Sequence, residues 1–164
     1  MAHQHSYLIA LGSNRLHPVI GAPERVITEA IDALEMVDID VFAHSSIVSS
    51  APVGPSARRY ANAAAIIASP LDPPALLARL HEIEAHFGRE RRGQAWRARV
   101  LDIDIILWSC GIWVGSHPPL GIPHAHMRSR GFVLGPASEI APDWRDPVSG
   151  LALRHLYARH KRHM

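Results

Sequence analysis

Two aspartates, one residue apart, are the part of the sequence whose type and spacing most directly suggest chemistry. Asp102 and Asp104 lie in the stretch Leu101-Asp102-Ile103-Asp104-Ile105-Ile106, which alternates as a β-strand does. Successive side chains of a strand point to opposite faces, so both carboxylates share one face, roughly 7 Å apart. Such a pair can hold two Mg²⁺ ions for phosphoryl transfer. An isolated Asp-x-Asp is also common on exposed strands that bind nothing.

An arginine-rich segment runs directly into these aspartates. Residues 88–99 carry five arginines against a single acid, Glu90: Arg89, Arg91, Arg92, Arg97 and Arg99. Positive side chains beside an acidic strand fit an anionic ligand such as ATP, held through metal ions on one side and guanidinium groups on the other. The alternative is a solvated basic loop that makes surface ion pairs of little energetic value.

Composition limits the classes of protein to consider. The chain has 164 residues, 48% hydrophobic and 20% charged, which predicts a single globular domain over residues 1–164. Its net charge of +2 is too small for a protein that coats nucleic acid. The apolar runs are short and the first residues carry no basic cluster, so we expect neither a membrane span nor a secretory signal. With one cysteine, Cys110, and therefore no internal disulfide, we expect a cytoplasmic protein.

Histidines are numerous but show no metal-binding pattern. The twelve of them are scattered, without His-x-x-x-His or Cys-x-x-Cys spacing. We therefore interpret most of them as surface residues. Cys110 is interpreted as a small buried residue that follows a strand.

The elements that must position these residues follow from periodicity and turn signals. We expect strands at residues 7–12, 39–50, 60–68 and 101–108, and helices at 23–34 and 73–87. The order βαββαβ is that of the ferredoxin-like α+β fold, an antiparallel sheet with helices packed on it. Beyond it we expect a short strand at 112–114, a proline-rich loop, a helix within 126–140 broken by Gly131, Gly135 and Pro136, and a C-terminal helix near 151–160.

Taken in order, several short motifs resemble those of the 6-hydroxymethyl-7,8-dihydropterin pyrophosphokinase family, whose members move pyrophosphate from ATP to a pterin alcohol in folate synthesis. The resemblance covers nearly the whole chain. Its motifs are Ala10-Leu11-Gly12-Ser13-Asn14, Pro52-Val53-Gly54-Pro55, Tyr60-x-Asn62-Ala63, Gly88-Arg89, Arg99-x-Leu101-Asp102-Ile103-Asp104, Pro123-His124 and Arg130-Gly131-Phe132. The family's ferredoxin-like fold agrees with the element order.

The resemblance implies roles on the nucleotide side of a site. Asp102 and Asp104 would hold two Mg²⁺ ions that bridge the phosphates of ATP, and Arg89 and Arg99 would assist the transfer. Arg91 would belong to a loop that closes over the substrates. Further positions matching the nucleotide site are Glu84, Trp96, Arg99, Ile105, His124 and Arg130.

On the pterin side, the resemblance implies that Tyr60 and Phe132 stack on the two faces of the substrate ring. Asn62 would read its polar edge, because an amide offers both a donor and an acceptor. Backbone groups around Val53 would complete the contact. The pterin hydroxyl would then attack the β-phosphorus in line, AMP would leave, and no protein nucleophile would be needed.

Two other functions remain open at this point. Arg97, Ala98 and Val100 depart from the family's usual pattern, so a relative that binds ATP or pterin without transfer is one alternative. A ferredoxin-like nucleic-acid-binding module is the other, although only Tyr7 and Trp108 are aromatic in the two central strands. We expect a monomer whose partners are the small molecules ATP and 6-hydroxymethyl-7,8-dihydropterin.

Overall fold

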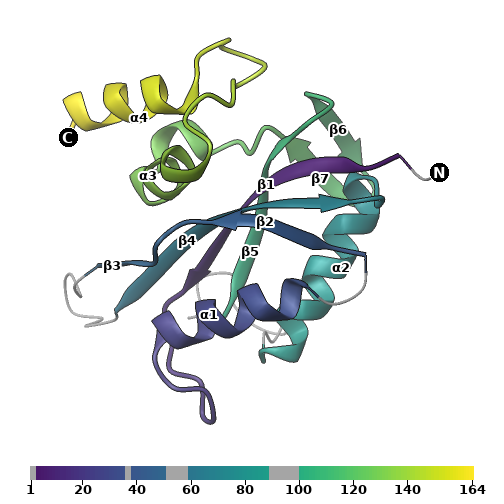
Figure 1. Ribbon diagram of the computed structural model, residues 1–164, viewed down its shortest axis with the longest axis vertical. Helices are drawn as coiled ribbons and strands as arrows, with labels where there is room; N and C mark the ends of the chain where they lie inside the picture. The colour runs from purple at the N-terminus through teal and green to yellow at the C-terminus, as the bar shows by residue number, and fades with distance from the viewer. Residues whose placement is uncertain (1–2, 36–37, 51–58, 89–99) are drawn as a thin grey trace.

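One antiparallel sheet organises the molecule, seen in a computed structural model that describes residues 3–35, 38–50, 59–88 and 100–164 (Figure 1). Its strands are β1 (His5–Ser13), β2 (Asp40–His44), β3 (Val48–Ser50), β4 (Tyr60–Ser69) and β5 (Asp102–Trp108). The order across the sheet is β2-β4-β1-β5, with β3 also paired to β4. This is the strand order of a split βαβ arrangement, so the predicted ferredoxin-like α+β fold is confirmed.

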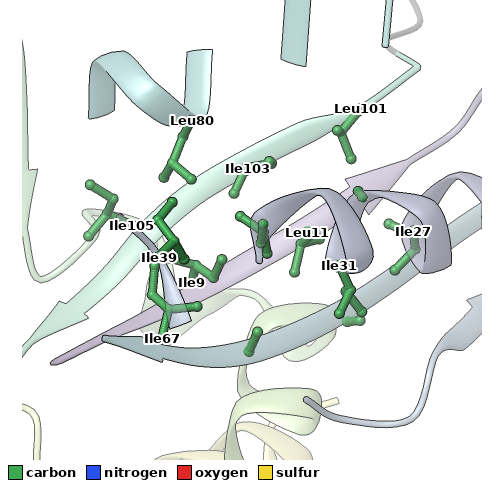
Figure 2. Close-up of a cluster of buried hydrophobic side chains, with 14 of the residues drawn as sticks. Ile9, Leu11, Ile27, Ile31, Ile39, Ile67, Leu80, Leu101, Ile103 and Ile105 are labelled. Atoms are coloured by element: carbon green, nitrogen blue, oxygen red, sulfur yellow. The ribbon is translucent and has the colours of Figure 1, made fainter. Parts of the chain in front are cut away.

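Two helices cover one face of the sheet, as predicted. Helix α1 (Pro23–Leu34) begins at a proline, and α2 (Pro73–His86) begins after Asp72, whose Oδ1 accepts the backbone N–H of Ala75 at 3.1 Å. Their apolar stripes meet the alternate residues of β1, β4 and β5. Figure 2 shows the resulting core, with Ile9 and Leu11 of β1 and Ile103 and Ile105 of β5 among its buried members.

The C-terminal part of the chain covers the opposite face. A hairpin of β6 (Trp113–Ser116) and β7 (Pro119–Ile122) follows β5, and a short 3₁₀ helix, η1 (Met127–Ser129), leads into α3 (Gly131–Ile140) and α4 (Leu153–Arg162). Leu134 and Leu153 pack there against Leu8 and Ile106, which makes a second, smaller core. The sheet therefore lies between two pairs of helices (Figure 1).

Four details differ from the sequence predictions. The strand expected over residues 39–50 is split into β2 and β3. Between these two strands, the Ser45 hydroxyl oxygen accepts a hydrogen bond from the backbone N–H of Ala64 at 2.9 Å, which interrupts the regular pairing. The proline-rich segment forms the β6–β7 hairpin rather than a loop. The helix expected to break at Gly135 and Pro136 continues through both. Cys110, expected to be buried, is exposed.

Within the described residues, no helix is both long and apolar enough to cross a bilayer. Tyr7, one of the two aromatic residues in the central strands, is fully buried, and its hydroxyl donates to the carbonyl of Leu71 at 2.6 Å. A buried ring cannot stack on a base, and this argues against the nucleic-acid-binding alternative.

Candidate active site

The two aspartates lie on the face of the sheet that α3 and α4 cover. In the register of β5 with β1, Asp102 is opposite Gly12 and Asp104 is opposite Ala10. Both aspartates are half-buried, whereas Ile103 between them is buried in the core beneath α1 and α2. The alternation expected from the sequence therefore places the two carboxylates on one face, at the end of β5 nearest the arginine-rich segment.

A shallow row of residues crosses the sheet beside Asp102. Gly12 of β1 is opposite Asp102 on one side and Asn62 of β4 on the other. Since neighbouring strands are about 4.8 Å apart, Asp102 and Asn62 are separated by roughly 10 Å across a floor of bare backbone. A Cβ at Gly12 would lie 3.2 Å from Oδ1 of Asn62, so the amide leans over the glycine. Gly12 belongs to the first sequence motif, and a glycine inside an apolar strand is the signal for such a close approach.

His124 joins the aspartates from the segment after β7. Its backbone N–H donates to the carbonyl of Ile106 at 3.0 Å, which ties this segment to the outer edge of β5. Its Nε2 then lies 3.8 Å from Oδ2 of Asp104, whose side chain is 47% exposed. The structure thus brings together His124 and Asp104, twenty residues apart in sequence, at the open side of the site.

Burial lowers the pKa of His124; the negative charge of Asp104 opposes this shift, and the positive charges of Arg130 and His126 add to it. The ring is therefore neutral near pH 7. Its Nδ1 accepts the backbone N–H of His126 at 3.1 Å, so the proton of the neutral ring is on Nε2, the atom that faces Asp104. His126 itself is exposed, as expected from the sequence.

Arg130 and Phe132 enter the site from the beginning of α3. Arg130 is the residue that precedes the first turn of the helix, and its guanidinium carbon lies 5.7 Å from the ring centroid of Phe132. Phe132 is 51% exposed and Tyr60, at the start of β4, is 41% exposed. Tyr60 is two residues before Asn62 in the strand, so both share the face of the aspartates. The accessible ring of Tyr60 therefore borders the row that contains Asn62, and Phe132 offers a second accessible ring beside Arg130.

Two predicted nucleotide-site residues have side chains turned away from this face. Ile105 is buried in the core beneath α1 and α2, so only its backbone can meet a ligand. Glu84 of α2 is fully buried, and its Oε2 accepts the backbone N–H of Ile103 at 3.1 Å. Glu84 therefore supports the strand segment between the two aspartates from the outer edge of β5. The remaining predicted site residues, Val53, Arg89, Arg91, Trp96 and Arg99, lie outside the described residues.

The comparison with known families agrees with this geometry. Residues 8–142 match the model of the 7,8-dihydro-6-hydroxymethylpterin-pyrophosphokinase family. The chain belongs to this family. Members are ATP diphosphotransferases of folate synthesis, and the matched region contains both aspartates, Asn62, His124 and Phe132.

Relatives in the pyrophosphokinase family span most of the chain. The 2-amino-4-hydroxy-6-hydroxymethyldihydropteridine pyrophosphokinase of Synechocystis sp. is 39% identical over 152 residues, 93% of this chain and 74% of its own. That of Pseudomonas aeruginosa is 38% identical over 150 residues, 90% of this chain and 85% of its own. The Haemophilus influenzae enzyme is 36% identical, over 93% of both chains.

Solved structures of larger proteins contain the same fold. The crystal structure of wild-type Plasmodium falciparum HPPK-DHPS matches with a TM-score of 0.77 over 99% of this chain, at 12% identity. This chain spans 42% of that one, so the likeness concerns one part of the larger protein. At such low identity the match supports the architecture of a pyrophosphokinase domain, and the assignment to the family rests on the sequence comparisons.

Proposed function

We propose that this chain transfers the pyrophosphoryl group of ATP to the hydroxymethyl group of 6-hydroxymethyl-7,8-dihydropterin, with Asp102 and Asp104 as the ligands of two Mg²⁺ ions. The observation that carries the proposal is the row on the sheet face opposite α1 and α2, where Asp102 lies across Gly12 from Asn62. The aspartate end of the row can bind metal ions and phosphates, and the Asn62 end can form hydrogen bonds with the pterin. The two ends are close enough to hold the reacting groups of both substrates together.

The aspartates suit magnesium by their chemistry. Mg²⁺ prefers oxygen ligands and keeps several waters, and the two half-buried carboxylates supply oxygen atoms on a face that water reaches. When bound, the ions would offset the negative charge of the phosphates and of the transition state.

On the nucleotide side, Arg130 and His124 would act beside Asp104. The guanidinium of Arg130 would attract phosphate oxygens, with its planar set of donors. The neutral ring of His124 would present the Nε2 proton to a nucleotide oxygen, because its Nδ1 is already engaged by His126. Glu84 would act indirectly, by holding Ile103 and with it the spacing of the two aspartates.

On the pterin side, Asn62 would pair with the amino-pyrimidinone edge while Tyr60 and Phe132 stack on the ring. The hydroxyl oxygen of the pterin would then attack the β-phosphorus. The bond between that phosphorus and the oxygen that joins it to the α-phosphate breaks, AMP departs with that oxygen, and the hydroxyl proton passes to solvent. Arg89 and Arg99 would stabilise this charge, while Arg91, Trp96 and Val53 would complete the two substrate sites.

The test is AMP release by Asp102→Asn and Asp104→Asn in the presence of Mg²⁺, ATP and the reduced pterin alcohol. Each substitution keeps the size of the side chain and removes its charge, so we expect a fall of about a hundredfold or more in the rate, with weaker Mg²⁺-dependent binding of ATP. Asp40→Asn, in the exposed strand position at the start of β2, is the matched control and should retain the wild-type rate.

Retained activity in both variants would refute the metal assignment. If the wild-type protein binds both substrates but releases no AMP above a blank, the chain is a binding relative and the proposed transfer is wrong.

A further inference from the structure

A second group of metal-ligating side chains lies at the other end of the same two strands. His3 precedes β1, His5 begins it, and Cys110 follows the end of β5. The pairing of Tyr7 with Trp108 aligns these ends. Backbone bonds extend the alignment past the strands, because Ser109 N–H donates to the carbonyl of Ser6 at 2.9 Å. The register of β1 with β5 thus places His5 beside Cys110, 105 residues later in the chain.

The ligand atoms of these three residues are close enough to share one ion. One atom each from His3, His5 and Cys110 all lie within 4.8 Å of one another. The Cys110 Sγ is 3.8 Å from Nδ1 of His5, and the rings of His3 and His5 are nearly perpendicular, with centroids 5.1 Å apart. In a tetrahedral zinc site, bond lengths of about 2.0 and 2.3 Å put nitrogen and sulfur about 3.5 Å apart. His5 and Cys110 already have nearly this spacing, and a side-chain rotation of the exposed His3 would bring its ring nitrogen nearer from within 4.8 Å.

The Nδ1 nitrogen of His5 is the ring atom that faces Cys110. The indole N–H of Trp108 donates to Nδ1 of His5 at 3.2 Å, and the thiol of Cys110 approaches the same atom. In a neutral imidazole, a nitrogen that accepts hydrogen bonds carries no proton, so Nδ1 of His5 can bind a metal once the indole N–H is displaced. An ion at this position would replace the thiol proton, which leaves to solvent, and would compete with the indole N–H.

We propose that His3, His5 and Cys110 form a zinc-binding site, with water as the fourth ligand. Two imidazoles and a thiolate suit Zn²⁺, whereas magnesium takes oxygen ligands. The six residue-to-residue steps from Asp102 to Trp108 separate the two ends of β5 by roughly 20 Å, so this site is distinct from the aspartate pair. Its ion would fasten residues 3–5 to the turn after β5.

The experiment titrates the full-length, metal-stripped protein with Co²⁺ and then with Zn²⁺. Cobalt bound by a thiolate gives a charge-transfer absorption band in the near ultraviolet, which we expect to saturate at one ion per chain and to disappear when Zn²⁺ is added. Cys110→Ser should abolish the band, and His5→Gln and His3→Ala should each weaken Zn²⁺ binding by more than about tenfold. His155→Ala, an exposed histidine of α4, is the matched control and should bind as the wild type does.

Two further measurements separate this site from the catalytic one. Zinc should raise the thermal unfolding midpoint of the wild type and not that of Cys110→Ser, because an ion that binds only the folded state stabilises it. The Cys110→Ser protein should keep the wild-type rate of AMP release with Mg²⁺. Absence of the thiolate band, equal Zn²⁺ affinity in the wild type and Cys110→Ser, or displacement of the ion by excess Mg²⁺ would each overturn the proposal.

Discussion

Gly12 is the residue whose size matters most for the floor of the site. It lies between Asp102 and Asn62, and an added methyl group would come within 3.2 Å of the Asn62 amide oxygen. We predict that Gly12→Ala pushes this amide aside by a few tenths of an ångström and weakens pterin binding about twofold to tenfold, the value of one hydrogen bond. Equilibrium binding of the pterin and of ATP, measured separately, checks this.

The control for that substitution is Gly121→Ala in β7, where an added Cβ would meet no atom within 4 Å. It should leave both affinities unchanged. If Gly12→Ala weakens ATP and pterin binding equally, the amide is not the group affected and the role given to Gly12 is wrong.

How far the sequence alone could define the site depends on how local each residue's placement is. Asp102 and Asp104 share a face because strand alternation fixes it within three residues. The approach of His124 to Asp104 depends instead on a hairpin and on one backbone bond to Ile106, which no local pattern contains. The family resemblance places Glu84 on the nucleotide side of the site. Its burial behind β5 depends on how α2 packs, which the motif does not contain.

At the scale of elements, the contact between α2 and β5 sets the geometry of the aspartate pair. Glu84 of α2 accepts the backbone N–H of Ile103 at the outer edge of β5, and without Glu84 this buried N–H would lose its acceptor. We predict that Glu84→Leu lowers the free energy of unfolding by about 1 to 3 kcal/mol and weakens Mg²⁺-dependent ATP binding. Glu84→Gln keeps an acceptor oxygen and should recover most of both losses. Urea unfolding and ATP titrations with and without Mg²⁺ measure the two effects.

Glu82→Leu, on the same helix, provides the comparison for Glu84. The Glu82 side chain is 67% exposed and pairs with Arg79, so its loss should change stability by less than about 0.5 kcal/mol. A Glu84→Leu protein as stable as the Glu82→Leu protein would show that the contact with Ile103 contributes nothing.

Helix α3 shows why local sequence propensity predicts some elements wrongly. Gly131 and Gly135 suggest helix breaks, but a Cβ at Gly131 would lie 2.7 Å from Nε2 of His160, and one at Gly135 would lie 3.3 Å from the Tyr157 hydroxyl. Both glycines are therefore positions where α4 packs closely on α3. Tertiary contact decides the local structure here, as it does where Ser45 interrupts the strand expected over residues 39–50.

At the scale of the whole molecule, each face of the sheet packs in its own hydrophobic core, and the two cores differ in structure and in role. The core with α1 and α2 contains the regular βαββαβ pattern, which periodicity predicts well. The core with α3 and α4 uses only a few sheet positions, such as Leu8 and Ile106, and its helices are short. Yet this second layer carries Arg130 and Phe132, so the predicted site depends on how firmly the C-terminal part is held against the sheet.

An ion pair between Arg128 and a buried carboxylate, Asp146, holds that C-terminal part. Asp146 is fully buried and accepts bonds from Nε and Nη2 of Arg128 at 2.6 and 2.7 Å, from the Ser149 hydroxyl at 2.7 Å and from the Val148 N–H at 3.0 Å. Burial alone would raise the pKa of Asp146, but these bonds outweigh it and lower the pKa from 3.8 to about 2. The pair joins η1 to the loop before α4.

The direction of this pKa shift fixes how stability depends on pH. A carboxyl with a lower pKa when folded stabilises the protein above its ordinary pKa, and this stabilisation is lost as pH falls toward the folded value. We predict that the wild type loses about 2 kcal/mol through Asp146 between pH 4 and pH 2. Asp146→Asn should be less stable at pH 7 and lack this part of the decline. Asp143→Asn, whose side chain is 83% exposed, should follow the wild-type profile in urea unfolding across the same range, and an Asp146→Asn profile parallel to the wild type would contradict the assignment.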